Sequence, residues 1–229
     1  ELAAVFHVAQ LAWLAGLVVP SAIRSALLPV LGHERHRPQQ YFREMNQALD
    51  MCFALLPFGL FGGYLVVAFM APLAFPAAYL DGTYGASAVD VFAVLLGGWA
   101  LTLLSTPTYT SLMAGPHPWR FTQFIFLVLL VAATAGYLLV FHMAESSGSV
   151  LYAAALASTV SAGVLMMLSW WMSRHTSFIQ KRRDEWALAL LGSLFIVVGL
   201  ATATWWWVLG LPLFCFTPQG WRAVRSTLG

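Results

Sequence analysis

Apolar residues occupy long, nearly continuous runs of this chain, and short polar segments separate the runs. The runs cover about residues 2–31, 48–73, 91–114, 121–141, 149–172 and 186–216. A helix needs roughly 20 apolar residues to cross the hydrocarbon layer of a bilayer, so each run is long enough for at least one crossing. None shows the period-two alternation over about ten residues that marks a transmembrane β-strand. The pattern predicts an all-α integral membrane protein, a helical bundle in a single domain over residues 1–229.

The last apolar run, 186–216, is long for one crossing and short for two. Three tryptophans at 205–207 lie at its middle, as in the aromatic belt at a membrane interface. Pro212 interrupts any helix beyond them. We therefore expect a compressed hairpin with legs at about 186–203 and 204–217. The bundle then has about seven transmembrane helices, or six if the run is one tilted helix.

The charged residues alternate in kind from one polar segment to the next. One set of segments is basic and carries Arg35, Arg37, Arg43, Arg120, Arg174, Lys181, Arg182 and Arg183, whereas the intervening set has no Lys or Arg and carries Asp81, Asp90 and Glu145. Cytoplasmic loops carry an excess of Lys and Arg. The alternation therefore predicts that the basic segments are cytoplasmic and that Glu1 lies on the outer side. Arg222 and Arg225 place the C-terminus in the cytoplasm as well.

The composition supports a membrane class and excludes others. Hydrophobic residues make up 60% of the chain and charged residues 9%, whereas a soluble domain carries about 25% charged residues. The net charge of +2 gives no footprint for nucleic acid. Cys52 and Cys215 both lie in apolar runs, which indicates a packing role. Because the chain opens at Glu1 inside an apolar run, we expect it to be the C-terminal part of a longer protein.

Arg24 is a basic residue inside the first apolar run. Ionisable groups within a membrane span are costly and usually face a polar cavity or a partner. In one interpretation Arg24 extends to the inner interface, because its long stem can lie along apolar surface. In the other it faces a cavity, where the guanidinium fork suits a phosphate or pyrophosphate. We take Arg24 as a candidate substrate-binding residue.

Asp50 lies at the start of the second run. It is either an interfacial carboxylate near Arg43 or Asn46, or a coupling site for a cation or proton. The second interpretation would suit a cation-coupled multidrug antiporter.

The third run contains the densest group of uncharged polar residues in any span, from Ser105 to Ser111. Pro107 leaves the carbonyl four residues earlier without its backbone donor, and such a break is tolerated inside a bundle or beside water but not beside lipid. This favours a lined cavity with Ser105, Thr106, Thr108 and Tyr109 as candidate substrate-binding residues. The alternative is that the hydroxyl groups bond back to their own helix.

Motifs for catalysis or metal binding are weak. His33 and His36 flank Glu34 in a charged segment and could share a helical face, but isolated pairs of this kind are rarely metal ligands. No HExxH, Cys-x-x-Cys or Gly-x-Ser-x-Gly motif occurs, nor a phosphate-binding Gly-Lys-Ser/Thr loop. We therefore expect a transporter without cofactor or metal. A membrane enzyme or a structural subunit stays as the alternative from another class.

Four segments resemble the polysaccharide flippases of the multidrug/oligosaccharidyl-lipid/polysaccharide exporter superfamily. They are PSAIRSALLPVLG from residue 20, LPFGLFGGYLVVAFMAPLAFPAAYLDGTYGASAVDVFAVLLGG from residue 56, TSLMAGPHPWRFTQ from residue 110 and SSGSVLYAAALASTVSAGVL from residue 146. The resemblance covers about residues 1–175, in the family's order and with its inside/outside alternation. Two departures are the extra Thr83 between Gly82 and Tyr84, and the Pro-His-Pro that follows Gly115.

The resemblance implies a carrier that flips a lipid-linked oligosaccharide of the undecaprenyl-pyrophosphate type from the inner to the outer leaflet of the bacterial inner membrane. Its mechanism would be alternating access between two lobes, and this chain would supply roughly the last seven of 12 to 14 helices. The implied partners are that glycolipid, membrane lipids and a polysaccharide polymerase. A drug/cation antiporter of the same superfamily is the second reading. No site residue is carried over from a family motif, so Arg24, the 105–109 segment and Asp50 rest on the physical arguments above.

Overall fold

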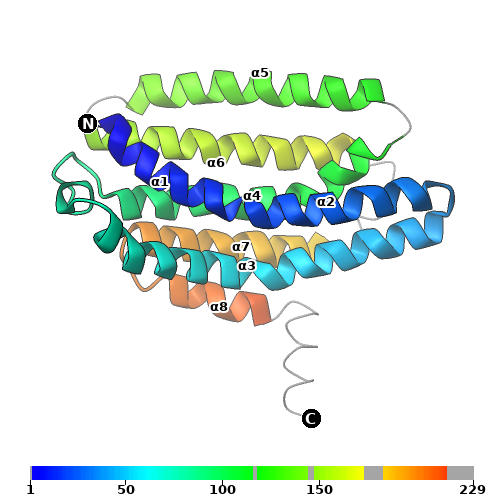
Figure 1. The fold of residues 1–229 in the computed structure, drawn as a ribbon, viewed down its shortest axis with the longest axis horizontal. Coiled ribbons are helices and arrows are strands. Elements are labelled where there is room, and N and C mark those ends of the chain that lie inside the picture. The colour runs from blue at the N-terminus through cyan, green and yellow to red at the C-terminus, as the bar shows by residue number, and fades with distance from the viewer. Residues whose placement is uncertain (1, 116–117, 144–146, 173–182, 216–229) are drawn as a thin grey trace, which may run out of the picture.

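The computed structural model describes residues 2–115, 118–143, 147–172 and 183–215, and these residues form an all-α bundle (Figure 1). The helices are α1 (Leu2–Gly16), α2 (Val18–His33), η1 (Glu34–His36), α3 (Pro38–Ala74), η2 (Ala77–Tyr79), α4 (Ala88–Met113), α5 (Pro118–Met143), α6 (Ser147–Met172), α7 (Arg183–Ala201) and α8 (Trp207–Cys215). The predicted fold class is confirmed.

Five helical stretches are long and apolar enough to cross a membrane: 2–36, α3, α4, α5 and α6. The chain is therefore a multi-pass membrane protein. The predicted bounds of the third, fourth and fifth spans agree with α4, α5 and α6 to within three residues. The second helix begins ten residues before the predicted position 48, because the polar stretch from Pro38 continues the helix and buries Met45 and Leu49.

The last apolar run forms a helical hairpin, as the sequence predicts, with a short second leg. α8 has nine residues and rises about 14 Å, less than half of the ~30 Å hydrocarbon layer. The two legs lie close together, since a Cβ atom on Gly210 would stand 2.7 Å from the Gly192 carbonyl oxygen. The predicted end of this leg, residues 216–217, lies outside the described residues, so the count of seven crossings stays a prediction.

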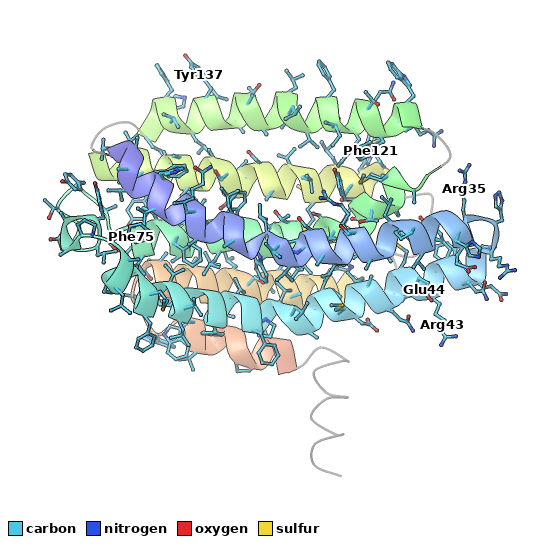
Figure 2. All side chains as sticks on the ribbon, viewed as in Figure 1. Arg35, Arg43, Glu44, Phe75, Phe121 and Tyr137 are labelled. Carbon is cyan, nitrogen blue, oxygen red and sulfur yellow. The ribbon has the colours of Figure 1, made fainter. Side chains whose placement is uncertain are left out.

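The orientation also stays a prediction. Glu1, Glu145, Arg174, Lys181, Arg182, Arg222 and Arg225 lie outside the described part of the chain. Within it, Arg35, Arg43 and Glu44 gather at the tip of the α2–α3 hairpin, and Phe75 lies at the opposite end of α3 (Figure 2). The basic segment and the 75–87 loop thus occupy opposite ends of the bundle.

α4 is the central helix of the bundle. It packs against α1, α2, α3, α6 and α7. In the most apolar 18-residue segment of α4, 72% of the residues are buried inside the bundle, compared with 11–28% in the corresponding segments of the other four stretches. α5 lies outermost and packs mainly on α6 (Figure 1).

The first span is broken where α1 meets α2. Gly16 ends α1, and the residue four positions later is Pro20, which has no N–H to donate to the Gly16 carbonyl. The indole Nε1 of Trp99 on α4 donates to that oxygen instead, at 2.9 Å. The helix of the first span is accordingly interrupted at Leu17, between α1 and α2.

Candidate functional site

A cavity of about 460 Å³ lies between α1, α3 and α4. We call it the α1–α3 cavity, and its walls include Ala12, Trp13, Gly62, Val66 and Phe92. It extends to Phe75 and Ala88, which flank the 75–87 loop. Each of these lining side chains is apolar apart from an indole N–H, so the cavity is suited to hydrocarbon.

A second opening of about 640 Å³ lies between α2 and α3. This α2–α3 groove is lined by Ala22, Ala26 and Met51, and by the polar side chains Glu44 and Gln47. Val19 lines both this groove and the α1–α3 cavity. The two openings therefore follow one boundary, between the broken first span and α3, along most of the length of the bundle.

Trp99 lines the α1–α3 cavity beside Gly16 and Gly59. Its side chain is only 4% exposed, and its ring fills the space that a side chain at Gly59 would occupy. A Cβ atom on Gly16 would lie 3.2 Å from the same ring, a tight contact. Trp99 thus packs between α1 and α3 where both helices carry a glycine, and the position of Gly59 has no room for a larger residue.

Arg24 lies half-buried on α2. Gly16 of the first span and Trp99 of α4 are in contact. Arg24 lies eight residues after Gly16, and Pro107 lies eight residues after Trp99, a helical rise of about 12 Å in each case. The backbone of Arg24 is therefore at about the level of the hydroxyl-rich segment of α4. Among the described residues, no hydrogen bond or ion pair involves Arg24. It lines neither the α1–α3 cavity nor the α2–α3 groove.

The hydroxyl-rich segment of α4 is buried, and its hydroxyl groups bond mainly to their own helix. Ser105 and Thr106 donate to the Thr102 carbonyl, both at 2.9 Å. Thr108 donates to the Ser105 carbonyl at 2.9 Å and shares a hydrogen bond with Ser169 of α6, also at 2.9 Å. This arrangement matches the alternative in which the hydroxyl groups bond back to the helix.

Tyr109 packs its ring against Phe121 and Phe124, with centroid distances of 5.5 and 5.9 Å. Neither Tyr109 nor the three hydroxyl residues line the two openings described above. Their role in binding substrate stays a prediction.

Asp50 is half-buried on α3 and does not line the α2–α3 groove, although Gln47 one turn earlier does. Its expected neighbour Asn46 donates its amide to the Phe42 carbonyl at 2.9 Å. The ion-coupling role of Asp50 stays a prediction.

The histidine pair does not form a convergent site. His33 and His36 are exposed, and Glu34 lies 3.9 Å from His33 Nε2 and 4.0 Å from Arg37 Nη1. In the part of the chain that the structure describes, no three His, Cys, Asp or Glu side chains are grouped as metal ligands would be. The cluster that a membrane enzyme would need is therefore not formed by these residues.

The 75–87 loop contains a turn at the extra threonine. The Asp81 carboxylate accepts hydrogen bonds from the hydroxyl and the backbone N–H of Thr83, the latter at 2.9 Å. These bonds lower the pKa of Asp81 from its ordinary value. Because the folded pKa is depressed, the turn is stabilised above the ordinary pKa and loses that contribution as pH falls through the lowered one.

The residues that shape the two openings were not singled out from the sequence. Trp99, Gly16 and Gly59 form the contact between three helices. The sequence signal for it was Pro20, whose missing N–H leaves the Gly16 carbonyl without its helical donor. Trp13 is a further omission. Its Nε1 is buried and has no hydrogen-bond partner in the described part of the chain.

Comparison of the chain with protein families, with curated proteins and with solved structures found no match.

Proposed function

We propose that this chain forms one lobe of a carrier that flips a lipid-linked oligosaccharide from the inner to the outer leaflet of the bacterial inner membrane. Its substrate would be of the undecaprenyl-pyrophosphate type, and a second lobe would complete the translocation pathway. The basic segments and the C-terminus would face the cytoplasm. In this role the protein is a transporter, with no chemistry on the glycan.

Arg24 is the observation on which this proposal rests. It is a guanidinium within a membrane span, about nine residues or ~14 Å from the end of α2 at His33. A charge at such a position is costly unless it meets a partner, and the described residues supply no ion pair. A pyrophosphate fits this requirement, because it accepts two parallel hydrogen bonds from a guanidinium.

The α2–α3 groove supports the lipid part of the substrate. Most of its lining is apolar, with Ala22, Ala26 and Met51 among the residues. Polar side chains occur in the same groove at Glu44 and Gln47. A polyprenyl chain that follows its head group across the bilayer needs apolar surface of this kind.

Replacement of Arg24 in the full-length protein tests the proposal. Hydrogen bonds to a charged group contribute about 1.5–3 kcal/mol, so Arg24→Ala should reduce glycan transport by roughly tenfold or more. The measurement is the amount of surface polymer, with the amount of folded membrane protein measured alongside. Arg24→Lys keeps the charge but not the fork and should retain part of the activity.

Arg35→Ala is the matched control, because Arg35 is exposed in η1 at the tip of the α2–α3 hairpin. It should leave surface polymer unchanged. Normal polymer in Arg24→Ala, at a normal protein level, would remove Arg24 from the mechanism and with it the support for a pyrophosphate substrate.

A further inference from the structure

We propose that the α1–α3 cavity binds one acyl chain of a bilayer phospholipid, from the leaflet on the side of the 75–87 loop. The site is separate from Arg24, which does not line it. The proposal holds whether or not the chain carries a glycolipid. It rests on the shape of the cavity, on its chemistry and on its position within three spans.

The cavity is elongated. Its lining follows α3 from Gly59 to Phe75, a helical rise of about 24 Å. Residues of α1 between Val8 and Gly16 and residues of α4 between Ala88 and Trp99 also line it. The space therefore runs along the helices, in a direction that an extended hydrocarbon chain can follow.

The lining excludes a polar ligand. Among the described residues, its only polar side-chain groups are the indole N–H groups of Trp13 and Trp99. Trp99 already donates to the Gly16 carbonyl, so a sugar or a phosphate would find almost no partners. Burial of polar groups without hydrogen bonds is unfavourable. A hydrocarbon chain has no polar group that would be left without a partner in such a space.

Glycines open the middle of the cavity. A Cβ atom on Gly62 would meet nothing within 4 Å, and one on Gly63 would only reach van der Waals contact with Leu96 at 3.5 Å. Val66 and Met70 are exposed at the rim, one and two turns further along α3. Because α1, α3 and α4 all belong to membrane-crossing stretches, this rim lies where lipid chains are available.

The depth suits an acyl chain whose head group stays at the interface. The end of the cavity at Phe75 and Ala88 adjoins the 75–87 loop, and Trp99 lines the cavity toward its other end, beside Gly16 and Gly59. The chain would enter beside the loop and run toward Trp99. Its glycerol and phosphate would remain outside, in the polar layer next to the loop.

The experiment fills the cavity and counts retained lipid. The full-length protein is reconstituted in vesicles of phosphatidylethanolamine and phosphatidylglycerol, extracted into detergent and examined by native mass spectrometry. Gly62→Phe places a ring in the cavity and should lose one bound phospholipid relative to the wild type. Gly32→Phe is the matched control, since Gly32 also has nothing within 4 Å of a Cβ atom but lies outside the cavity. It should retain that lipid.

A second measurement locates the ligand and covers a folding failure of Gly62→Phe. A photoreactive phenylalanine replaces Val66, and the extracted protein is irradiated. We expect a phospholipid adduct at Val66 and none at Phe126, an exposed residue of α5 outside the cavity. A cross-link to another segment of the protein would overturn the proposal, because a protein segment would then fill the space. Equal lipid counts in Gly62→Phe and Gly32→Phe, or an adduct with the mass of a polyprenyl phosphate, would overturn it as well.

Discussion

The two flanks of α4 are built differently. Toward α6, the helices approach closely: Thr159 Oγ1 donates to the Val94 carbonyl at 3.1 Å, and a Cβ atom on Gly98 would lie 3.3 Å from the Thr159 Cα. Toward α1 and α3, the bulky Trp99 ring packs against Gly16 and Gly59, and the α1–α3 cavity lies beside it. One flank therefore brings small residues into close contact, and the other places a large side chain beside an open space.

Because of this difference, α4 holds α6 in place on one side and lines the α1–α3 cavity on the other. Small residues and hydroxyl groups let helix backbones approach where lipid offers no hydrophobic driving force. The α6 flank uses this device along its length, with Gly97, Gly98, Thr108 and Ser169. On the opposite flank the large Trp99 side chain lies between α4 and the glycines of α1 and α3, and we call it the wedge. The space for a ligand therefore arises on the flank that contains the wedge, and the close packing against α6 is kept.

Removal of the Trp99 side chain should lower the unfolding free energy more than any other substitution considered below. Trp99→Ala deletes a nearly buried ring and leaves the Gly16 carbonyl without its donor. Truncation of a buried Trp costs about 3–5 kcal/mol, measured as the loss in unfolding free energy of the full-length protein in mixed micelles. Trp119→Ala is the control, because that side chain is 69% exposed, and it should change stability by less than about 0.5 kcal/mol. A cost for Trp99→Ala as small as the control would show that the flank does not depend on this contact.

Two alanine substitutions one turn apart on α3 should have opposite signs. In Gly59→Ala the new methyl group would collide with the Trp99 ring, and overpacking costs about 1–3 kcal/mol. In Gly62→Ala the methyl group enters open space, and the better helix propensity of Ala should stabilise the protein by up to about 1 kcal/mol. Both are measured by the same unfolding assay.

The pair also has an internal check. Trp99→Phe shortens the ring and should relieve part of the penalty of Gly59→Ala, which appears as a coupling energy in a double-mutant cycle. It should leave the effect of Gly62→Ala unchanged. Equal changes in unfolding free energy for Gly59→Ala and Gly62→Ala would mean that the Trp99 ring moves aside without an energetic penalty.

The sequence was sufficient for the helices and insufficient for their neighbours. Runs of about 20 apolar residues are a strong signal because every backbone group in the hydrocarbon layer must be paired within a helix. The same apolarity hides which face is buried, since lipid tails are as apolar as Leu. Nothing in the pattern therefore identified α4 as central, or Trp99 as the residue between Gly16 and Gly59.

For the candidate polar residues too, the position along a helix was predicted from sequence, whereas the partners were not. The hydroxyl groups of Ser105, Thr106 and Thr108 are explained by their own backbone and by Ser169, which local sequence could only offer as an alternative. Arg24 lies in a helical stretch that is long and apolar enough to cross a membrane, and its role in binding substrate stays a prediction. The depth of a residue in the membrane can be derived from its position along a helix. The neighbour that its side chain faces can be found only from the packed bundle.

The hydrogen bond across the tight flank should have the smallest effect of the three. Thr108→Val removes the hydroxyl that joins Ser169 of α6, while the shape of the side chain is kept. Ser169 still donates to the Met166 carbonyl, so no buried donor is left unpaired. Hydrogen bonds between membrane helices contribute about 0.6 kcal/mol on average and at most ~1.7. We expect a loss of that size in unfolding free energy, and Thr108→Ser, which keeps the hydroxyl, should lose less. A loss as large as that of Trp99→Ala would contradict the comparison, because the α6 flank would then also depend on one contact.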